Sequence, residues 1–418
     1  MHMSKPHVVI VGAGFGGVYT AKALVPYVKK GLIDVTIINK TNYFLFTPLL
    51  HEVATGGLSA RSVTESVRHI FEGTGVIFHQ GTVEALDPKQ GTLSVDGKEI
   101  TFDYVVVATG AVTNFYGIKG AEEHSFVLKN LQDAVEIRER IIDAFEDASS
   151  VENTDQRKKE LTFVVVGGGA TGVEMAAEMA EFITTLFERY FKGVSQIKKE
   201  DISVHLVNTA PEVLAMLHPS LRKKTAEHLE YLGVQLHMNM SVTEVTAESV
   251  VFADGTSIDT HFVFWAGGIT PSLPRFSGVE PLLAGGKLVT DAFLRMKGSD
   301  RVFVLGDSAL AETPAGKGYP ALAQIASRQG PVVAENIMLS LAHKPLKTFS
   351  YTIKGTLVSL GQWYAVGEMF GLKLSGRLMW WIWRTVYLFN FHSWTKRFKI
   401  AFEWTEALFS PRDITKLR

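Results

Sequence analysis

The sequence predicts an α/β fold made of two similar modules, followed by a helical segment at the C-terminal end. Two observations support this prediction. A hydrophobic strand that leads through a glycine-rich turn into a helix occurs twice, at residues 7–17 and 161–172. From about residue 373 the composition changes, and tryptophan becomes frequent among aliphatic and basic residues.

Both turns carry the spacing Gly-x-Gly-x-x-Gly. The first glycine allows a tight turn, the second lets a pyrophosphate approach the backbone, and the third lets the helix pack on the strand. The start of the helix then faces the negative charge. One such pattern is weak evidence, but two of them a domain's length apart predict two Rossmann-like domains that hold two dinucleotides, with electron transfer between them. The spacing is formed by Gly12, Gly14, Gly17, Gly167, Gly169 and Gly172.

Hydrophobic periodicity and turn residues place the other elements. We expect helices that run to about Val28, from Val173 and from about Pro320. Strands are expected at residues 34–39, 75–80, 92–95, 104–108, 202–208, 262–266 and 302–305, with hairpin turns at Asp96-Gly97 and Asp254-Gly255 and a strand-rich segment at 348–367. Residues 147–160 are polar and are expected to be a helix end and a linker. Pro331 should kink or end its helix.

Composition excludes several classes of protein. The chain has 418 residues, which allows two or three domains with real cores. It has no cysteine, so a disulfide framework and a dithiol redox centre are excluded. The thirteen histidines are scattered, so we expect no metal site. The net charge of −1 gives no case for nucleic-acid binding. No apolar segment precedes the strand at His7, so we expect no secretory signal and a cytoplasmic location.

Two further strand ends favour a flavin at the first glycine turn. One apolar strand ends in Thr109-Gly110, and another ends in Gly306-Asp307, whose carboxylate can hydrogen-bond a polyol such as a ribityl chain. Each feature alone is more often an ordinary strand end. Together, and in this order, they favour a bound flavin.

The chain resembles the type II NADH:quinone oxidoreductases over essentially its whole length. The most specific match is the segment 42–59, and shorter matches occur at 265–268, 305–307 and 323–326. The resemblance implies FAD in the first domain and NADH or NADPH in the second, with their rings stacked and a quinone reached from the other side. The absence of cysteine counts against relatives that use thiols, such as sulfide:quinone and disulfide reductases.

The resemblance also implies domain bounds and binding residues. The FAD-binding domain would comprise residues 1–115 and 286–347, the NAD(P)H-binding domain 116–285, and the quinone- and membrane-associating region 348–418. The residues expected at FAD are Gly12, Gly14, Gly16, Gly17, Asn39, Lys40, Pro48, Thr109, Gly110, Gly306, Asp307 and Gln324. Those expected at NAD(P)H are Gly167, Gly169, Thr171, Gly172, Glu174, Asn208 and Gly267.

Two residues are expected to act in catalysis. Glu174 lies where the family has a glutamate near the rings, and it would orient the nicotinamide or supply a proton; otherwise it is an acid favoured by the helix dipole. Gln324 lies where the family has a glutamine near the flavin and the quinone; otherwise it is a polar residue at the edge of the core. The family often repeats this glutamine four residues later, but that position is Arg328 and the glutamine is at 329. Arg328 is therefore the second expected quinone contact.

Both ribose positions depart from the usual pattern. An acidic residue normally accepts from the ribose hydroxyl at the end of the second strand. Here the two strands end in Asn39 and Asn208. An amide still bonds a hydroxyl but does not repel a 2′-phosphate. The sequence therefore predicts weakened discrimination against NADPH.

The C-terminal segment has the composition of a membrane-surface helix. Five of the seven tryptophans lie between residues 380 and 404, and residues 373–418 hold nine Lys or Arg against three Asp or Glu. No apolar run reaches the ~20 residues of a spanning helix. Leu378, Ile382, Val386 and Phe389 recur at helical spacing, and Lys396, Arg397 and Lys399 would lie near anionic headgroups. The alternative is a helix that packs on its own domain or on a dimer mate.

These features predict a monotopic enzyme on the cytoplasmic face of the cell membrane. It would transfer a hydride from NAD(P)H to FAD and then reduce a quinone, ubiquinone or menaquinone, by two electrons without pumping protons. We expect a homodimer. A soluble reductase of an electron-carrier protein and a redox-sensing interaction protein are the alternatives.

Overall fold

The computed structural model describes residues 5–314, 316–391, 393–410, 412 and 414–416. Its packing divides the chain into two compact units. Unit 1 comprises Met1–Leu45, Thr64–Val112 and Ile269–Ile353, and unit 2 comprises Phe46–Val63, Thr113–Gly268 and Lys354–Arg418. Strands β10 (Ala111–Thr113) and β18 (Ile269–Pro271) occur where the chain passes between the units. This division reflects packing alone, so the domain bounds expected for the two dinucleotides stay a prediction.

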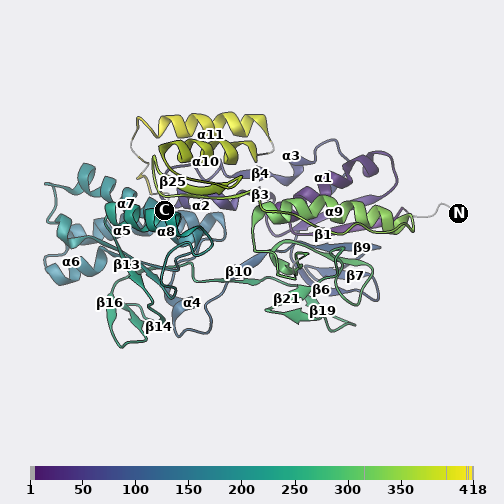
Figure 1. The fold of residues 1–418 in the computed structure, drawn as a ribbon, viewed down its shortest axis with the longest axis horizontal. Helices are drawn as coiled ribbons and strands as arrows, with labels where there is room; N and C mark the ends of the chain where they lie inside the picture. The colour runs from purple at the N-terminus through teal and green to yellow at the C-terminus, as the bar shows by residue number, and fades with distance from the viewer. Residues whose placement is uncertain (1–4, 315, 392, 411, 413, 417–418) are drawn as a thin grey trace. The chain divides into compact units, whose positions relative to one another are not determined.

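Unit 1 is built on a parallel sheet in the order β22-β9-β1-β2-β5. These strands are Val302–Val304, Tyr104–Val107, His7–Val11, Asp34–Asn39 and Ile77–Gln80. Helix α1 (Phe15–Lys29) packs against α9 (Ala323–Leu341), as Figure 1 shows. The two helices approach closely at Gly330, where an added Cβ would lie 2.8 Å from the Thr20 nitrogen. Nearly continuous apolar strands are what a sheet covered on its faces requires.

Smaller elements complete unit 1. Strands β6 (Val83–Asp87), β7 (Thr92–Val95) and β8 (Lys98–Thr101) form an antiparallel meander, with the expected hairpin at Asp96-Gly97. The remaining elements are β3 (Tyr43–Leu45), β4 (Thr64–Ser66), α3 (Val67–Ile70), β19 (Arg275–Phe276), β20 (Leu283–Ala284), β21 (Lys287–Val289), η4 (Gly306–Ser308) and β23 (Ala309–Leu310). The side chains of β7, β9 and β22 meet in one buried cluster.

Unit 2 repeats the arrangement around a parallel sheet in the order β13-β12-β11-β17. These strands are Val234–Met238, Ser203–Asn208, Thr162–Val166 and Phe262–Trp265. The glycine turn after β11 leads into α7 (Ala170–Leu186), and β14 (Val242–Val245), β15 (Ser249–Phe252) and β16 (Ser257–Asp259) form a second meander. The other elements before the C-terminal segment are η1 (Thr47–Leu49), α2 (Leu50–Ala54), α4 (Ala121–His124), α5 (Leu131–Ser150), α6 (Thr154–Glu160), η2 (Phe187–Phe191), η3 (Lys199–Asp201) and α8 (Pro219–Tyr231).

The C-terminal segment of unit 2 combines a small sheet with two helices. Strands β24 (Gly355–Ser359), β25 (Ala365–Met369) and β26 (Leu372–Gly376) are antiparallel. Helix α10 (Arg377–Phe389) packs on this sheet and against α11 (Trp394–Glu406), and the two helices lie side by side in Figure 1. The α/β fold with two similar modules and a helical C-terminal segment is confirmed.

Pro331, where we expect a kink or an end of the helix, does not end it, because α9 begins at Ala323 and continues through the proline to Leu341. The kink stays a prediction. The buried face of α9 against α1 compensates for the single backbone hydrogen bond that proline removes. Residues 154–160 are not a linker but helix α6, capped by the Asn153 side chain, which accepts from the nitrogens of Asp155 and Gln156. A buried ion pair of 2.8 Å between Arg157 and Asp201 anchors this polar helix, and no hydrophobic periodicity reveals it.

Candidate active site

The first glycine turn has the steric properties that its spacing requires. Gly12 has a φ of +105°, and an added Cβ there would lie 2.3 Å from the Ala108 oxygen. A Cβ at Gly17 would lie 1.8 Å from the Gly12 oxygen, and one at Gly16 would lie 1.9 Å from the Leu305 side chain. Gly14 differs, because it caps α1 and a Cβ there would meet no atom within 4 Å. The space before the helix is thus open, as a phosphate at a helix N-terminus needs.

The second glycine turn has the same geometry. Gly167 has a φ of +118°, and an added Cβ would lie 2.6 Å from the Ala266 oxygen. A Cβ at Gly172 would lie 1.9 Å from the Gly167 oxygen, whereas one at Gly169, which caps α7, would meet nothing within 4 Å. Thr171 follows in the first turn of α7. Both turns therefore fit a pyrophosphate, and the residues of each unit fit one dinucleotide.

Asn39 and Asn208 each brace the turn beside them, a role that the sequence reasoning missed. The Asn39 Oδ1 accepts from the Ala13 nitrogen at 3.0 Å, and its Nδ2 donates to the Thr41 oxygen at 2.9 Å. The Asn208 Oδ1 accepts from the Gly168 nitrogen at 3.2 Å, and its Nδ2 donates to the Glu212 oxygen at 3.0 Å. The same residue type at the end of both second strands was the available signal. Lys40, which follows Asn39, is exposed.

The strand ends of unit 1 that were assigned to the flavin lie together. The Thr109 and Ser308 hydroxyls are 3.1 Å apart, and Ser308 Oγ also donates to the Gly110 oxygen at 3.3 Å. Gly306 has a φ of +66° and begins η4, which contains Asp307. The two segments that follow β9 and β22 are therefore linked to each other by hydrogen bonds of the Ser308 hydroxyl.

Gln324, Arg328 and Gln329 differ in burial and in their contacts. Gln324 is half-buried at the start of α9, and the Tyr351 hydroxyl lies 3.5 Å from its Oε1. Gln329 is buried, and its Oε1 accepts from the Gly306 nitrogen at 2.7 Å, so it braces the loop of Asp307. Arg328 is exposed, and its contact with a quinone stays a prediction.

Two predicted residues lie in unit 2. Pro48, which is expected at FAD, is part of η1, and Gly267, which is expected at NAD(P)H, follows β17. A Cβ added to Gly267 would lie 3.1 Å from the Trp265 indole, whose Nε1 donates to the Asn114 oxygen at 2.9 Å.

Glu174 belongs to a cluster of buried charged side chains in unit 2. Its Oε1 accepts from the Ser359 nitrogen at 3.2 Å, and its Oε2 lies 3.9 Å from His51 Nδ1. Sequence reasoning found Glu174 but missed the rest of the cluster, whose acids on α7 lie at spacings of four and three residues. The other members are Glu52, Glu178, Glu181, Arg384 and Arg412.

Burial dominates the acid–base properties of this cluster. It raises the pKa of Glu174 to about 8, although the hydrogen bond from Ser359 acts in the opposite direction. Burial likewise raises the pKa of Glu181 to about 8 and that of Glu52 to about 7. It lowers the pKa of His51 to about 4. Several of these acids therefore hold a proton at neutral pH, which is the state of a proton donor.

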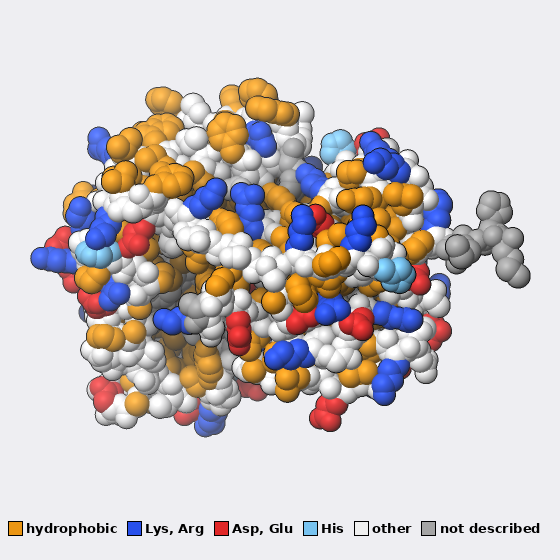
Figure 2. All heavy atoms as spheres, turned by 45° about the vertical axis from the view of Figure 1, so that its right-hand side comes forward, with side chains coloured by type: hydrophobic (Ala, Val, Ile, Leu, Met, Phe, Trp, Pro, Cys, Tyr) orange, Lys and Arg blue, Asp and Glu red, His pale blue; other side chains and the backbone are white. Residues whose placement is uncertain are grey.

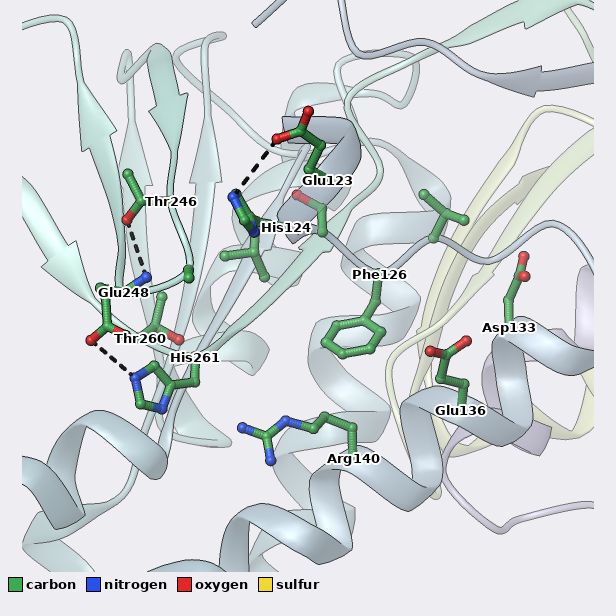
Figure 3. Close-up of a pocket in the computed structure, with 14 residues that line it drawn as sticks. Glu123, His124, Phe126, Asp133, Glu136, Arg140, Thr246, Glu248, Thr260 and His261 are labelled. Atoms are coloured by element: carbon green, nitrogen blue, oxygen red, sulfur yellow. Dashed lines mark hydrogen bonds and ion pairs between the residues drawn. The ribbon is translucent and has the colours of Figure 1, made fainter. Parts of the chain in front are cut away.

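A cavity of about 530 Å³ in unit 2 contains none of the predicted site residues. It is lined by both acidic and basic groups, among them Glu123, His124 and Arg140, as Figure 3 shows. Its His261 already lies 2.7 Å from Glu160 and 3.3 Å from Glu248. The volume alone does not mark the active site, because several of the charged groups that line it already have ion-pair partners, as His261 has in Glu248 and Arg140 in Asp147.

The two C-terminal helices expose an apolar surface. Leu378, Val386 and Phe389 of α10 are exposed as their helical spacing predicts, and Phe398 and Phe402 of α11 are 71 % and 70 % exposed. Hydrophobic side chains gather over these helices in Figure 2. Beside them the Arg397 guanidinium lies 4.7 Å from the Trp394 ring, and Lys399 pairs with Glu403 at 3.6 Å. Within the described residues, no helix is both long enough and apolar enough to cross a bilayer.

Comparison with known proteins identifies the family of the chain. The family model for pyridine nucleotide-disulphide oxidoreductases matches residues 6–330, and the NDH2 C-terminal domain matches residues 353–413. The chain is 31 % identical to a probable NADH dehydrogenase of Dictyostelium discoideum, with 97 % of this chain and 90 % of the relative covered. It is 30 % identical to the type II NADH:quinone oxidoreductase Ndh of Mycobacterium tuberculosis, with 98 % and 89 % covered.

A solved structure shares the fold. NDH2 from Plasmodium falciparum, solved in complex with NADH, superposes with a TM-score of 0.90 at 22 % identity, covering 99 % of this chain and all of the other. The chain therefore belongs to the type II NADH:quinone oxidoreductase family of enzymes.

Proposed function

We propose that this protein oxidises NADH and reduces a membrane quinone, with noncovalent FAD in unit 1 and the nicotinamide nucleotide in unit 2. The observation that carries the proposal is the pair of glycine turns with equal geometry, each followed by an open helix N-terminus. FAD supplies the two-electron exchange between the nicotinamide and the quinone. The overall reaction converts NADH, one proton and a quinone into NAD⁺ and a quinol.

The residues of the protein have distinct parts in this reaction. The backbone nitrogens after Gly14 and Gly169 would hold the two pyrophosphates, and the two strand-end segments that contain Thr109 and Asp307 would hold the flavin chain. Glu174 holds a proton that it can give to the reduced quinone. The Gln324 carboxamide orients the ring of the acceptor.

The exposed face of α10 and α11 attaches the enzyme to the cytoplasmic surface of the cell membrane. Trp394 and Phe398 are exposed aromatic side chains next to basic residues, and this combination suits the headgroup region of a bilayer. A lipid-soluble quinone then enters from the membrane. The reaction moves no proton across the bilayer, and the enzyme acts as a homodimer.

Anaerobic reduction followed by reoxidation tests the function. The purified protein should be yellow, should release FAD on denaturation, and should be bleached by NADH. A quinone should then restore the colour rapidly. Reoxidation by ferredoxin but not by quinones would favour a soluble reductase of an electron carrier, and slow turnover with every acceptor would favour a redox-sensing protein.

Vesicle binding tests the membrane surface. Deleting the whole segment would also remove the buried Trp380 and Trp383, so substitution is the cleaner change. Phe398→Glu with Phe402→Glu should abolish most binding to anionic vesicles, whereas Phe370→Glu, at an exposed position in the β25–β26 turn, serves as the matched control. Unchanged binding by the double variant would exclude this face as the anchor.

A further inference from the structure

Tyr116 is an exposed aromatic residue that is held in a strained backbone conformation. Its φ is +54°, in the left-handed region that bulky residues rarely adopt, and the residue is 62 % exposed. Two hydrogen bonds maintain this conformation: the Asn114 Oδ1 accepts from the Tyr116 nitrogen at 2.8 Å, and the Asn114 nitrogen donates to the Gly268 oxygen at 3.0 Å. Backbone strain at a residue that adds little to the core indicates a function for its side chain.

The residues on either side of Tyr116 anchor its turn to unit 2. Phe115 and Ile118 pack against the buried cluster formed by β11, β15 and β17. The Phe115 ring lies 5.9 Å from the Trp265 ring, and Trp265 Nε1 donates to the Asn114 oxygen at 2.9 Å. The turn is thus fixed at both ends, and the Tyr116 side chain is the part that projects from it.

The Tyr116 ring lies over the carboxyl end of strand β17. An added Cβ at Gly268 would lie 2.1 Å from the Tyr116 hydroxyl oxygen and 2.7 Å from Cζ, so the phenol covers this glycine. Strand β17 pairs with β11, which leads into the second glycine turn, and an added Cβ at Gly167 would lie 3.1 Å from the Gly267 nitrogen. The phenol therefore borders the same edge of the sheet as that turn.

The corresponding place in unit 1 has no such cover. Gly110 is the equivalent of Gly268, because they lie two residues after Ala108 and Ala266, the alanines whose oxygens face the first glycine of each turn. A Cβ added to Gly110 would meet no described atom within 4 Å, whereas one at Gly268 would collide with Tyr116. The aromatic cover thus occurs in the unit to which we assign the nicotinamide nucleotide.

The fold indicates which part of a dinucleotide would reach this place. In the order β13-β12-β11-β17 the chain reverses direction across the sheet between β11 and β17, and a dinucleotide binds across such a point. The adenosine ribose is expected at the end of β12, where Asn208 lies, and the pyrophosphate at the turn before α7. The nicotinamide half then extends to the other side of β11, toward β17 and Tyr116.

We propose that Tyr116 holds the nicotinamide half of NADH against the carboxyl end of β17. The inference rests on the proposed function. The face of the phenol packs on the nicotinamide ribose, which reaches it past Gly267, an exposed residue without a side chain. Holding this half in one place raises the fraction of bound nucleotide that is aligned for hydride transfer.

A hollow beside Tyr116 gives the ring space to turn aside. Asn114, Tyr116 and Gly117 are among the residues that line a cavity of about 540 Å³. Rotation about the Cα–Cβ bond therefore moves the phenol without moving the anchored backbone. Since NADH has to enter and NAD⁺ has to leave in each turnover, a side chain that turns suits this edge of unit 2.

Binding of nucleotides to the oxidised holoenzyme tests the contact. Tyr116→Ala should raise the Kd of NAD⁺ by about tenfold, as expected for loss of an aromatic contact. The Kd of ADP, which has the adenosine and the pyrophosphate but no nicotinamide half, should not change. Tyr116→Phe keeps the ring and should stay within about twofold of the wild type for both nucleotides. Tyr231→Ala removes an 82 % exposed tyrosine at the end of α8 and is the matched control.

Half-reaction kinetics separate alignment from affinity. At saturating NADH the flavin of Tyr116→Ala should be bleached about tenfold more slowly, because a nicotinamide that is not held is less often aligned for hydride transfer. Reoxidation of the dithionite-reduced variant by a soluble quinone should keep its wild-type rate, since this step involves no nicotinamide. A side chain that only supported the fold would slow both half-reactions and weaken the binding of ADP as well.

The outcomes distinguish this contact from the proposed function. If Tyr116→Ala binds NAD⁺ and is bleached like the wild type, or if ADP binding weakens as much as NAD⁺ binding, the contact is wrong. It is also wrong if Tyr116→Phe is as impaired as Tyr116→Ala, or if Tyr231→Ala has the same effect. If NADH does not bleach the wild-type protein, the proposed function itself is wrong. Weaker NAD⁺ binding and slower bleaching, with unchanged ADP binding and reoxidation, support the contact.

Discussion

The two glycine turns are nearly identical, whereas the helices that follow them differ. In both turns the first glycine has a positive φ and its oxygen lies where a Cβ of the third would clash, at 1.8 Å in unit 1 and 1.9 Å in unit 2. Both turns are braced by an asparagine at the end of the second strand. The similarity thus extends to a side chain outside the glycine spacing, as expected for a duplicated module.

The difference begins one turn into each helix. Glu174 lies five residues after Gly169, whereas Tyr19 lies five residues after Gly14. Helix α1 packs its small residues against α9, but α7 places a row of acids among cations and aromatic rings. The geometry of the turn therefore suits a phosphate in either unit, and the two units differ in the side chains of the helix that follows the turn.

Matched alanine variants of the third glycine in each turn should abolish nucleotide binding in one unit at a time. Gly17→Ala should yield protein without bound flavin, because the added Cβ forces the turn open at a cost of about 1–3 kcal/mol or more. Gly172→Ala should remain yellow and be reduced by dithionite but not by NADH. Flavin content and bleaching kinetics measure both effects.

Each of these variants is the control for the other, since the clash is almost the same. Thermal melting verifies that the protein is folded. If Gly172→Ala loses its flavin while Gly17→Ala keeps it, the assignment of the cofactors to the two units is reversed.

The sequence predicts most of the fold because the signals are local. Strand periodicity and glycine spacing depend on neighbouring residues, and they located both sheets and the hairpins at Asp96 and Asp254. The features that the sequence did not show depend on interactions between distant residues. Helix α6 depends on Arg157 meeting Asp201, and α9 continues past Pro331 because of its packing on α1.

The candidate site divides in the same way. The turn glycines and Glu174 are predicted from spacing and resemblance, and their roles stay predictions. The cluster around Glu174 draws on α2, α10 and Arg412, each of which lies more than a hundred residues from Glu174 in the sequence. No local pattern could show that Arg412 pairs with Glu178, because a single arginine near the chain end has no distinctive context.

Glu174→Gln should alter the pH dependence of both activity and stability. Because burial raises the folded-state pKa of Glu174 to about 8, the acid is a proton donor below that pH, and quinone reduction should fall as pH rises through it. The glutamine variant should be about 10²-fold slower and lack this decline. Rates measured from pH 6 to pH 10, with NADH bleaching as the control, check the effect.

The sign of the stability effect follows from proton linkage. Between the ordinary pKa of a glutamate and about 8, the folded protein holds a proton that the unfolded chain releases, so stability falls as pH rises. Melting temperatures should therefore decline less between pH 5 and pH 9 for Glu174→Gln than for the wild type. Tyr19→Phe in α1 should leave the wild-type decline unchanged. Parallel curves for Glu174→Gln and wild type would exclude a buried, protonated Glu174.

Asn208→Glu should produce the smallest effect, a shift in nucleotide preference. A carboxylate repels a 2′-phosphate, so the ratio of kcat/KM for NADH over NADPH should rise by about tenfold, or about 1.4 kcal/mol.

The hydrogen bonds of the Asn208 side chain complicate this substitution, because glutamate can accept from the Gly168 nitrogen but cannot donate to the Glu212 oxygen. Asn208→Gln keeps the amide and adds no charge, so it separates the brace from the repulsion. Asn39→Glu makes the same change in unit 1 and should leave the ratio unaltered, since we propose that FAD and not the nicotinamide nucleotide binds at that turn. If Asn208→Glu leaves the ratio unchanged, the amide does not govern the choice of nucleotide; if Asn39→Glu shifts it instead, the two turns have exchanged roles.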